Sequence, residues 1–173
     1  MKYSKEQIMR LEKMLLAKEQ RANVQKKLIE EYNDSLISFM LNIPGQVKNS
    51  KEFVDFHKGY IEEIKKTLKE KNILILKEEY FNKETGMEYF AIVHCDEKLL
   101  KKYMVDIEER NDKTRLLDID IFSKEYNQIS RSSLNLPNRK CIVCNDDAKS
   151  CIRLEKHNIN ELEEKVKDII KGC

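Results

Sequence analysis

The chain has 173 residues, of which 37% are charged and 40% apolar, and 33 Lys and Arg against 31 Asp and Glu leave a net charge of +2. This length and composition are typical of one soluble globular domain and exclude a disordered chain. The near-neutral balance also argues against a protein that binds nucleic acid through bulk positive charge, although a local basic patch remains compatible with it.

Membrane and secretory features are absent from the sequence pattern. The longest apolar run has five residues, 89–93, whereas a membrane span needs roughly 20. The N-terminus leads into a charged amphipathic helix and lacks the apolar segment of a signal peptide. Five cysteines, an odd number, argue against a disulfide framework. We therefore expect a cytoplasmic protein with no membrane partner.

The first elements are marked by caps and periodicity. Ser4 and Gln7 form a capping-box pattern, which predicts the start of a helix. Apolar residues at near-helical spacing extend this helix to about residue 33, and we expect their stripe to lie on the rest of the domain. They are Ile8, Leu11, Leu15, Ala22, Leu28 and Tyr32. Residues 36–42 then predict a buried strand that ends at 43–45.

In the middle of the chain, helical and strand patterns of apolar residues alternate. Ser50 predicts the cap of a second helix with apolar residues at a 3.6-residue period. Residues 73–80 and 87–94 are β-rich runs joined by a hairpin at 82–86. Asp96 predicts the cap of a third helix, and 115–122 predicts a fourth strand. An irregular Cys-bearing stretch then precedes a last helix capped by Asn160.

Residues 36–122 thus follow the order β-α-β-β-α-β, which predicts an α+β, ferredoxin-like antiparallel sheet with both helices on one face. In that arrangement the first strand lies beside the fourth, and the loop at 43–49 lies near the start of the fourth. We expect one domain over 1–173. Its core sheet spans 36–122, and its Cys/His-bearing C-terminal segment, 127–173, ends in a helix.

The fourth strand carries two acids in alternation with apolar residues. Asp118 and Asp120 share one face of such a strand, because side chains alternate between faces. Two carboxylates so close repel each other unless protons or a cation intervene. Magnesium prefers oxygen ligands and often combines carboxylates with substrate phosphates. The alternative is two solvated acids on an exposed strand.

Three cysteines and a histidine follow the sheet with metal-ligand spacing. Cys141-x2-Cys144-x6-Cys151-x5-His157 supplies the four ligands of a tetrahedral zinc site. A metal could order this segment, which has few large apolar residues. The alternative is that the cysteines are small packing residues and His157 lies in water.

Basic and hydroxyl side chains suited to phosphate oxygens surround this segment. They are Ser130, Arg131, Arg139 and Arg153, with Lys48 from the neighbouring loop. A solvated basic face is the alternative. No P-loop, Rossmann, nucleophile-elbow or zincin motif occurs in the sequence, which excludes those enzyme classes.

Taken in order, these pieces closely resemble the citrate lyase holo-[acyl-carrier protein] synthases, also called apo-citrate lyase phosphoribosyl-dephospho-CoA transferases. The matching motifs are Arg115-x2-Asp118-Ile-Asp120, Ile129-Ser-Arg131, Leu136-Pro137-x-Arg139-Lys-Cys141-x2-Cys144, Cys151-x-Arg153 and His157, with Asn42-Ile-Pro-Gly45 and Ile107-Glu108 earlier. Members often carry glycine where this chain has Thr114, Asn127 and Asn135. We expect asparagine to support the turns at 127 and 135, because it tolerates left-handed backbone.

The resemblance implies a nucleotidyltransferase. A serine of the acyl-carrier subunit of citrate lyase would attack triphosphoribosyl-dephospho-CoA, and pyrophosphate would leave. Asp118 and Asp120 would hold Mg²⁺. Arg115, Arg131 and Arg139 would contact phosphates, with Lys48 in a lesser role. Two alternatives remain at this point. One is a zinc-stabilised module that binds nucleic acid or an acidic protein, and the other is the same transfer onto a malonate decarboxylase carrier.

Overall fold

The computed structural model describes residues 4–172. In chain order they form α1 (Lys5–Tyr32), β1 (Ser35–Leu41), α2 (Lys51–Glu70), β2 (Ile75–Lys83), β3 (Gly86–Val93), α3 (Glu97–Glu108), η1 (Lys113–Leu116), β4 (Leu117–Phe122), η2 (Ser132–Leu134), α4 (Ala148–Arg153) and α5 (Ile159–Lys171). Ser4, Ser50 and Asp96 cap α1, α2 and α3 as predicted, each by accepting a hydrogen bond from a backbone N–H of the first turn.

The strands form one antiparallel sheet in the order β2-β3-β1-β4. The predicted pairing of the first strand with the fourth is confirmed, and its register places Ser38 opposite Asp120 and Met40 opposite Asp118. The loop after β1 lies near the start of β4, also as predicted, since the Asn42 N–H donates to the Leu116 carbonyl over 2.8 Å. The mixed helix-and-sheet class expected from the sequence is therefore present.

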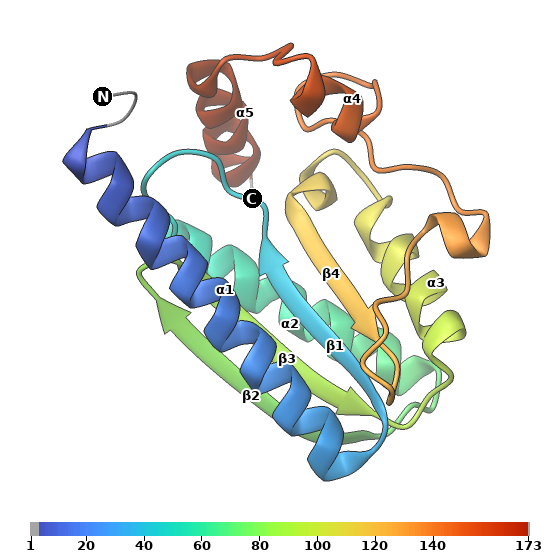
Figure 1. The fold of residues 1–173 in the computed structure, drawn as a ribbon. Helices are drawn as coiled ribbons and strands as arrows, with labels where there is room; N and C mark the ends of the chain where they lie inside the picture. The colour runs from blue at the N-terminus through green and yellow to red at the C-terminus, as the bar shows by residue number, and fades with distance from the viewer. Residues whose placement is uncertain (1–3, 173) are drawn as a thin grey trace.

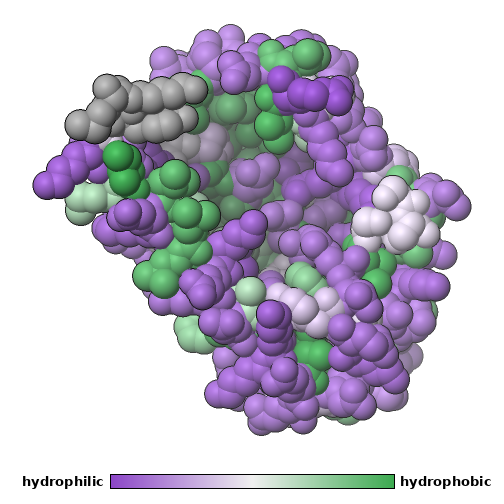
Figure 2. Space-filling model, viewed as in Figure 1, coloured by the Kyte–Doolittle hydropathy of each residue, from purple (hydrophilic) through white to green (hydrophobic). Residues whose placement is uncertain are grey.

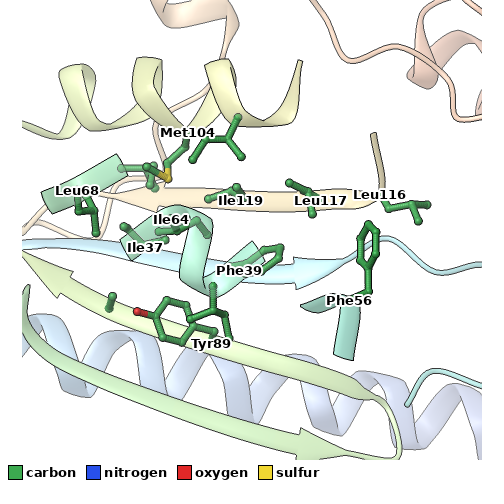
Figure 3. Packing of buried hydrophobic residues seen from close by; sticks show 14 of the residues in the cluster. Ile37, Phe39, Phe56, Ile64, Leu68, Tyr89, Met104, Leu116, Leu117 and Ile119 are labelled. Atoms are coloured by element: carbon green, nitrogen blue, oxygen red, sulfur yellow. The ribbon is translucent and has the colours of Figure 1, made fainter. Parts of the chain in front are cut away.

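Helices cover both faces of the sheet, as Figure 1 shows. On one face, α2 and α3 pack over β1, β3 and β4, and residues such as Ile64, Met104 and Ile119 are completely or almost completely buried there (Figure 3). On the other face, α1 contributes Leu28 and Ile29 to a smaller apolar cluster with residues of β1, β3 and β4. Apolar burial on this scale is the main force that holds the two layers to the sheet.

The buried residues of α1 begin at Ala17, so the expectation that its whole apolar stripe lies on the rest of the domain is wrong. Ile8, Leu11 and Leu15 are 42%, 59% and 58% exposed, and Figure 2 shows this apolar surface along α1. The 28-residue helix is about 42 Å long, whereas the seven residues of β1 span only about 23 Å. The helix therefore extends past the strand it covers. None of the helices within residues 4–172 has the length and apolar content needed to cross a bilayer.

Several predicted boundaries are wrong for local reasons. Arg115 lies in η1, before the strand, because the Asn111 side chain accepts hydrogen bonds from the N–H groups of Lys113 and Thr114 and bends the chain there. The last helix is capped by Asn158, and not by Asn160, because Asn158 and Glu161 form a reciprocal capping box. The short helix α4 lies in the stretch that was expected to be irregular.

One of the two expected asparagine turns is confirmed and the other differs. Asn135 adopts the left-handed conformation, with φ of 54°, as predicted for a position where family members often carry glycine. At the other turn the left-handed residue is Tyr126, with φ of 63°, and not Asn127. Thr114 is buried, and its hydroxyl donates to the Glu108 carbonyl over 2.9 Å. The threonine therefore ties the start of β4 to the end of α3.

Candidate active site

A cleft of about 800 Å³ opens beside β4. Its walls come from β4, from α3 and η1, from the chain between residues 128 and 142, and from α4 and the start of α5. Most of the residues predicted to carry chemistry line it, and these are Arg115, Asp118, Asp120, Ser130, Arg131, Arg139, Cys141, Cys151 and His157. Lys48, Cys144 and Arg153 are not among the described lining residues.

The two acids of β4 share the face of the sheet on which α1 also lies. Asp118 accepts a hydrogen bond from Arg139 Nη1 over 2.6 Å, and Asp120 accepts one from Gln128 Nε2 over 2.8 Å. Burial raises the pKa of the Asp120 carboxyl and the charge of Asp118 raises it further, while Lys101 and Gln128 act in the opposite direction. Such a pair of oxygen donors fits a hard divalent cation, whose charge would relieve the repulsion.

The free edge of β4 is covered by polar partners and is not left open. The backbone N–H of Ile119 donates to Glu108 Oε1 over 2.9 Å, and its carbonyl accepts from Lys101 Nζ over 2.8 Å. The Leu117 carbonyl accepts from Arg139, and the Ile121 carbonyl accepts from the Ile129 N–H. The outward groups of an edge strand normally face solvent or another strand. Here the side chains of Lys101 and Glu108 from α3, the side chain of Arg139 and the backbone N–H of Ile129 take that place.

Two arginines, Arg131 and Arg139, line the cleft near this edge of β4. Arg139 reaches both the Asp118 carboxylate and the Leu117 carbonyl. Arg131 donates to Glu108 Oε2 and to Glu109 Oε1, each over 2.5 Å, and only 10% of its side chain is exposed. Both guanidinium groups are thus held in place by carboxylates at the rim of the cleft, where their planar forks suit phosphate oxygens.

The other predicted phosphate contacts lie in different surroundings. Arg115 donates to the Cys141 carbonyl and to Asn145 Oδ1, both over 3.0 Å, so its fork holds the Cys-bearing loop. Lys48 donates to the Ile43 carbonyl, and burial lowers its pKa. Arg153 is exposed at the end of α4. Ser130 lies in the cleft wall and its hydroxyl contacts that of Ser132 over 3.0 Å.

The three cysteines and the histidine converge. Their ligand atoms all lie within 4.8 Å of one another, with Cys144 Sγ 3.6 Å from Cys151 Sγ and 3.4 Å from His157 Nε2. Tetrahedral bonds of 2.3 Å to zinc place two sulfurs about 3.8 Å apart, which is close to the spacing found here. The thiols are free, and hydrogen bonds from the Asp146 backbone and from His157 lower the pKa of Cys144. This cluster could hold a metal ion such as zinc.

Lys101, Glu108 and Gln128 were missed as site residues by sequence reasoning. Lys101 and Glu108 are both 5% exposed although they carry charges. Their seven-residue separation places them on one face of α3, next to the apolar residues Leu100, Met104 and Ile107. Opposite charges at that spacing on the buried side of a helix were the available signal.

Comparisons with known proteins cover nearly the whole chain. The family model described as apo-citrate lyase phosphoribosyl-dephospho-CoA transferase, CitX, matches residues 9–173. The chain is 31% identical to the probable transferase of that name from Streptococcus pyogenes serotype M18, over 97% of this chain and 88% of that protein. It is 29% identical to the Vibrio cholerae serotype O1 protein of the same name, over 92% and 90%.

A longer relative is also found. The chain is 33% identical to "Protein CitXG" from Haemophilus influenzae over 94% of its own length, but it spans only 35% of that protein. The chain belongs to the apo-citrate lyase phosphoribosyl-dephospho-CoA transferase family.

Proposed function

We propose that this protein attaches the phosphoribosyl-dephospho-CoA group to a serine of the acyl-carrier subunit of citrate lyase and releases pyrophosphate. The names of its relatives support the transferred group and citrate lyase as the acceptor. The observation that carries the proposal is the pair Asp118 and Asp120 in a cleft of about 800 Å³ that also holds Arg131 and Arg139. Paired acids beside guanidinium groups suit transfer from a polyphosphate.

In this reaction the serine oxygen attacks the phosphorus of the triphosphate that is attached to the ribose. The bond from that phosphorus to the oxygen bridging to the next phosphate breaks, and pyrophosphate leaves with the electron pair. One carboxylate of the pair accepts the hydroxyl proton. Asp118 and Asp120 would hold Mg²⁺, which when bound neutralises charge on the phosphates. The carrier provides the nucleophile, so the enzyme needs none of its own.

The arginines divide between two tasks. We assign Arg131 and Arg139, with Ser130, to the phosphates, because all three lie in the cleft wall. The negative charge of a triphosphate would compete with Asp118 for Arg139, once a cation offsets the carboxylate. Arg115 holds the Cys-bearing loop through backbone carbonyls, so we assign it a supporting task. Lys48 and Arg153 lie outside the cleft lining and remain candidates for binding the outer part of the precursor.

We further propose that zinc binds Cys141, Cys144, Cys151 and His157 and orders the segment that carries Arg139.

The strand order and the placement of α2 and α3 on one face support a ferredoxin-like core. We treat residues 1–173 as one domain, with the core sheet at 36–122 and the zinc segment within 127–173. We place its activity in the cytoplasm.

The experiment is a mass measurement of the carrier. Purified protein, apo-carrier, triphosphoribosyl-dephospho-CoA and Mg²⁺ should add one prosthetic group to the carrier and yield one pyrophosphate. A carrier with its serine changed to alanine should gain nothing. Asp118→Asn and Asp120→Asn should melt like the wild type yet transfer at least about 100-fold more slowly, because several kcal/mol of charge stabilisation are lost.

Two outcomes would contradict the proposal. Near-normal transfer by both aspartate variants would refute the metal-holding role of the pair. Modification of a malonate decarboxylase carrier, with none of the citrate lyase carrier, would refute the acceptor while keeping the reaction class.

A further inference from the structure

The geometry points to Lys101 and Glu108 as positioning residues that clamp the strand of the carboxylate pair. This inference rests on the proposed function only for its effect on transfer. Ile119 lies between Asp118 and Asp120, and its two backbone polar groups point away from β1. Glu108 Oε1 accepts from the Ile119 N–H over 2.9 Å, while Lys101 Nζ donates to the Ile119 carbonyl over 2.8 Å.

The two side chains imitate a missing neighbouring strand. β4 is the edge of the sheet and pairs with β1 on one side only. A further strand would supply one acceptor and one donor to each outward-facing residue. The carboxylate of Glu108 and the ammonium group of Lys101 supply that pair of partners to Ile119 from the helix that packs beside β4.

The burial of these two charged side chains indicates that they have a structural role at the edge of β4. Both residues are 5% exposed, and charged side chains are rarely buried unless they are paired. Each has a partner here: Glu108 accepts from the Ile119 N–H and from Arg131 Nη2, and Lys101 donates to the Ile119 carbonyl. Burial lowers the pKa of Lys101, and the charge of Glu108 opposes that shift. Without these contacts the Ile119 N–H and carbonyl would be left unsatisfied inside the protein.

The clamp acts on the reaction through the backbone of β4. Asp118 and Asp120 are the two residues that flank the clamped one, so movement of Ile119 changes the separation and direction of both carboxylates. Catalytic groups must keep their productive geometry within about 0.5 Å, and a misplacement of about 1 Å can cost roughly 100-fold in rate. Through Arg131, Glu108 also ties the strand to one basic wall of the cleft.

The first test is amide hydrogen exchange at Ile119, which requires no substrate. Glu108→Ala should speed exchange of this amide by about tenfold or more, because its acceptor is lost. Glu109→Ala is the matched control: Glu109 pairs with the same Arg131, but the Ile119 N–H donates to Glu108, so the Ile119 amide should stay protected. Equal protection of Ile119 in wild type and in a folded Glu108→Ala would overturn the clamp. If Glu108→Ala does not fold, Lys101→Met tests the clamp instead.

The second test separates positioning from general stability. Lys101→Met keeps the apolar stem and removes the donor, whereas Lys101→Arg keeps a donor and should rescue part of the activity. Lys101→Met should lower kcat about tenfold or more with KM for the precursor within about twofold. Lys102→Met, at an exposed neighbour, should behave like the wild type.

The outcomes distinguish this inference from the proposed function. Unchanged kcat in a folded Lys101→Met would refute the clamp and leave the transferase proposal intact. If the wild type transfers nothing to the carrier, the proposed function fails, and the Ile119 exchange rates in wild type, Glu108→Ala and Glu109→Ala still decide whether the clamp exists.

Discussion

His57 of α2 provides a stability prediction whose size follows from its surroundings. The side chain is completely buried, its Nε2 lies 3.2 Å from the Phe39 carbonyl oxygen, and its ring stacks on that of Phe39 with centroids 4.2 Å apart. Its Nδ1 has no hydrogen-bond partner within residues 4–172. A proton on Nδ1 would therefore add a buried charge with no acceptor. Burial lowers the pKa of His57 from 6.5 to about 4.

The direction of the pH effect on stability follows from the protonation of His57 in the folded and the unfolded chain. Below pH 6.5 the unfolded chain takes up a proton at His57, whereas the folded chain takes it up only near pH 4. Acid therefore favours unfolding across this window, and the effect is absent above pH 6.5. The interval between 6.5 and about 4, at about 1.4 kcal/mol per pH unit, amounts to a loss of about 3 kcal/mol in the free energy of unfolding.

The measurement is urea unfolding of wild type and His57→Gln between pH 7.5 and 4. Glutamine keeps an N–H donor for the Phe39 carbonyl but does not titrate, so all other groups contribute equally to both proteins. The wild type should lose about 3 kcal/mol more than the variant over this range. Parallel pH dependences of the two proteins would refute the reasoning, because His57 would then titrate alike in the folded and unfolded states.

Three further predictions concern the cleft, the thiols and α1. Arg139→Gln should slow transfer about 100-fold in the carrier mass assay while the melting temperature stays near that of the wild type, because the charge faces the cleft; wild-type rates would refute its phosphate role. Cys144→Ser should weaken zinc binding at least about tenfold in chelator competition, whereas Cys95→Ser, outside the cluster, should not; equal affinities would exclude the zinc site. Leu28→Ala should cost about 2–4 kcal/mol in urea unfolding, but Leu15→Ala less than about 0.5 kcal/mol, and equal losses would show that both halves of α1 pack alike.

Local patterns predicted much of the fold. Caps at Ser4, Ser50 and Asp96 depend on a side chain that bonds to its own first helical turn, so the amino-acid sequence nearby is sufficient. The pairing of β1 with β4 followed from the order of the elements, because few connections of six alternating elements are allowed. The boundary at Arg115 was mispredicted because the η1 turn depends on Asn111 and Thr114, which do not interrupt the apolar alternation that follows them.

Within the candidate site, the sequence by itself determined that Asp118 and Asp120 lie on one face of a strand, since the two-residue period of a strand is a local property. The spacing of Cys141, Cys144, Cys151 and His157 likewise favoured a four-ligand metal site. Which side chains meet those groups was decided only by the tertiary structure. Lys101 and Glu108 reach Ile119 across 18 and 11 residues of chain, and that contact requires α3 to pack beside the open edge of β4. The position of a helix against a sheet edge results from burial of the whole apolar core, which no short stretch of sequence encodes.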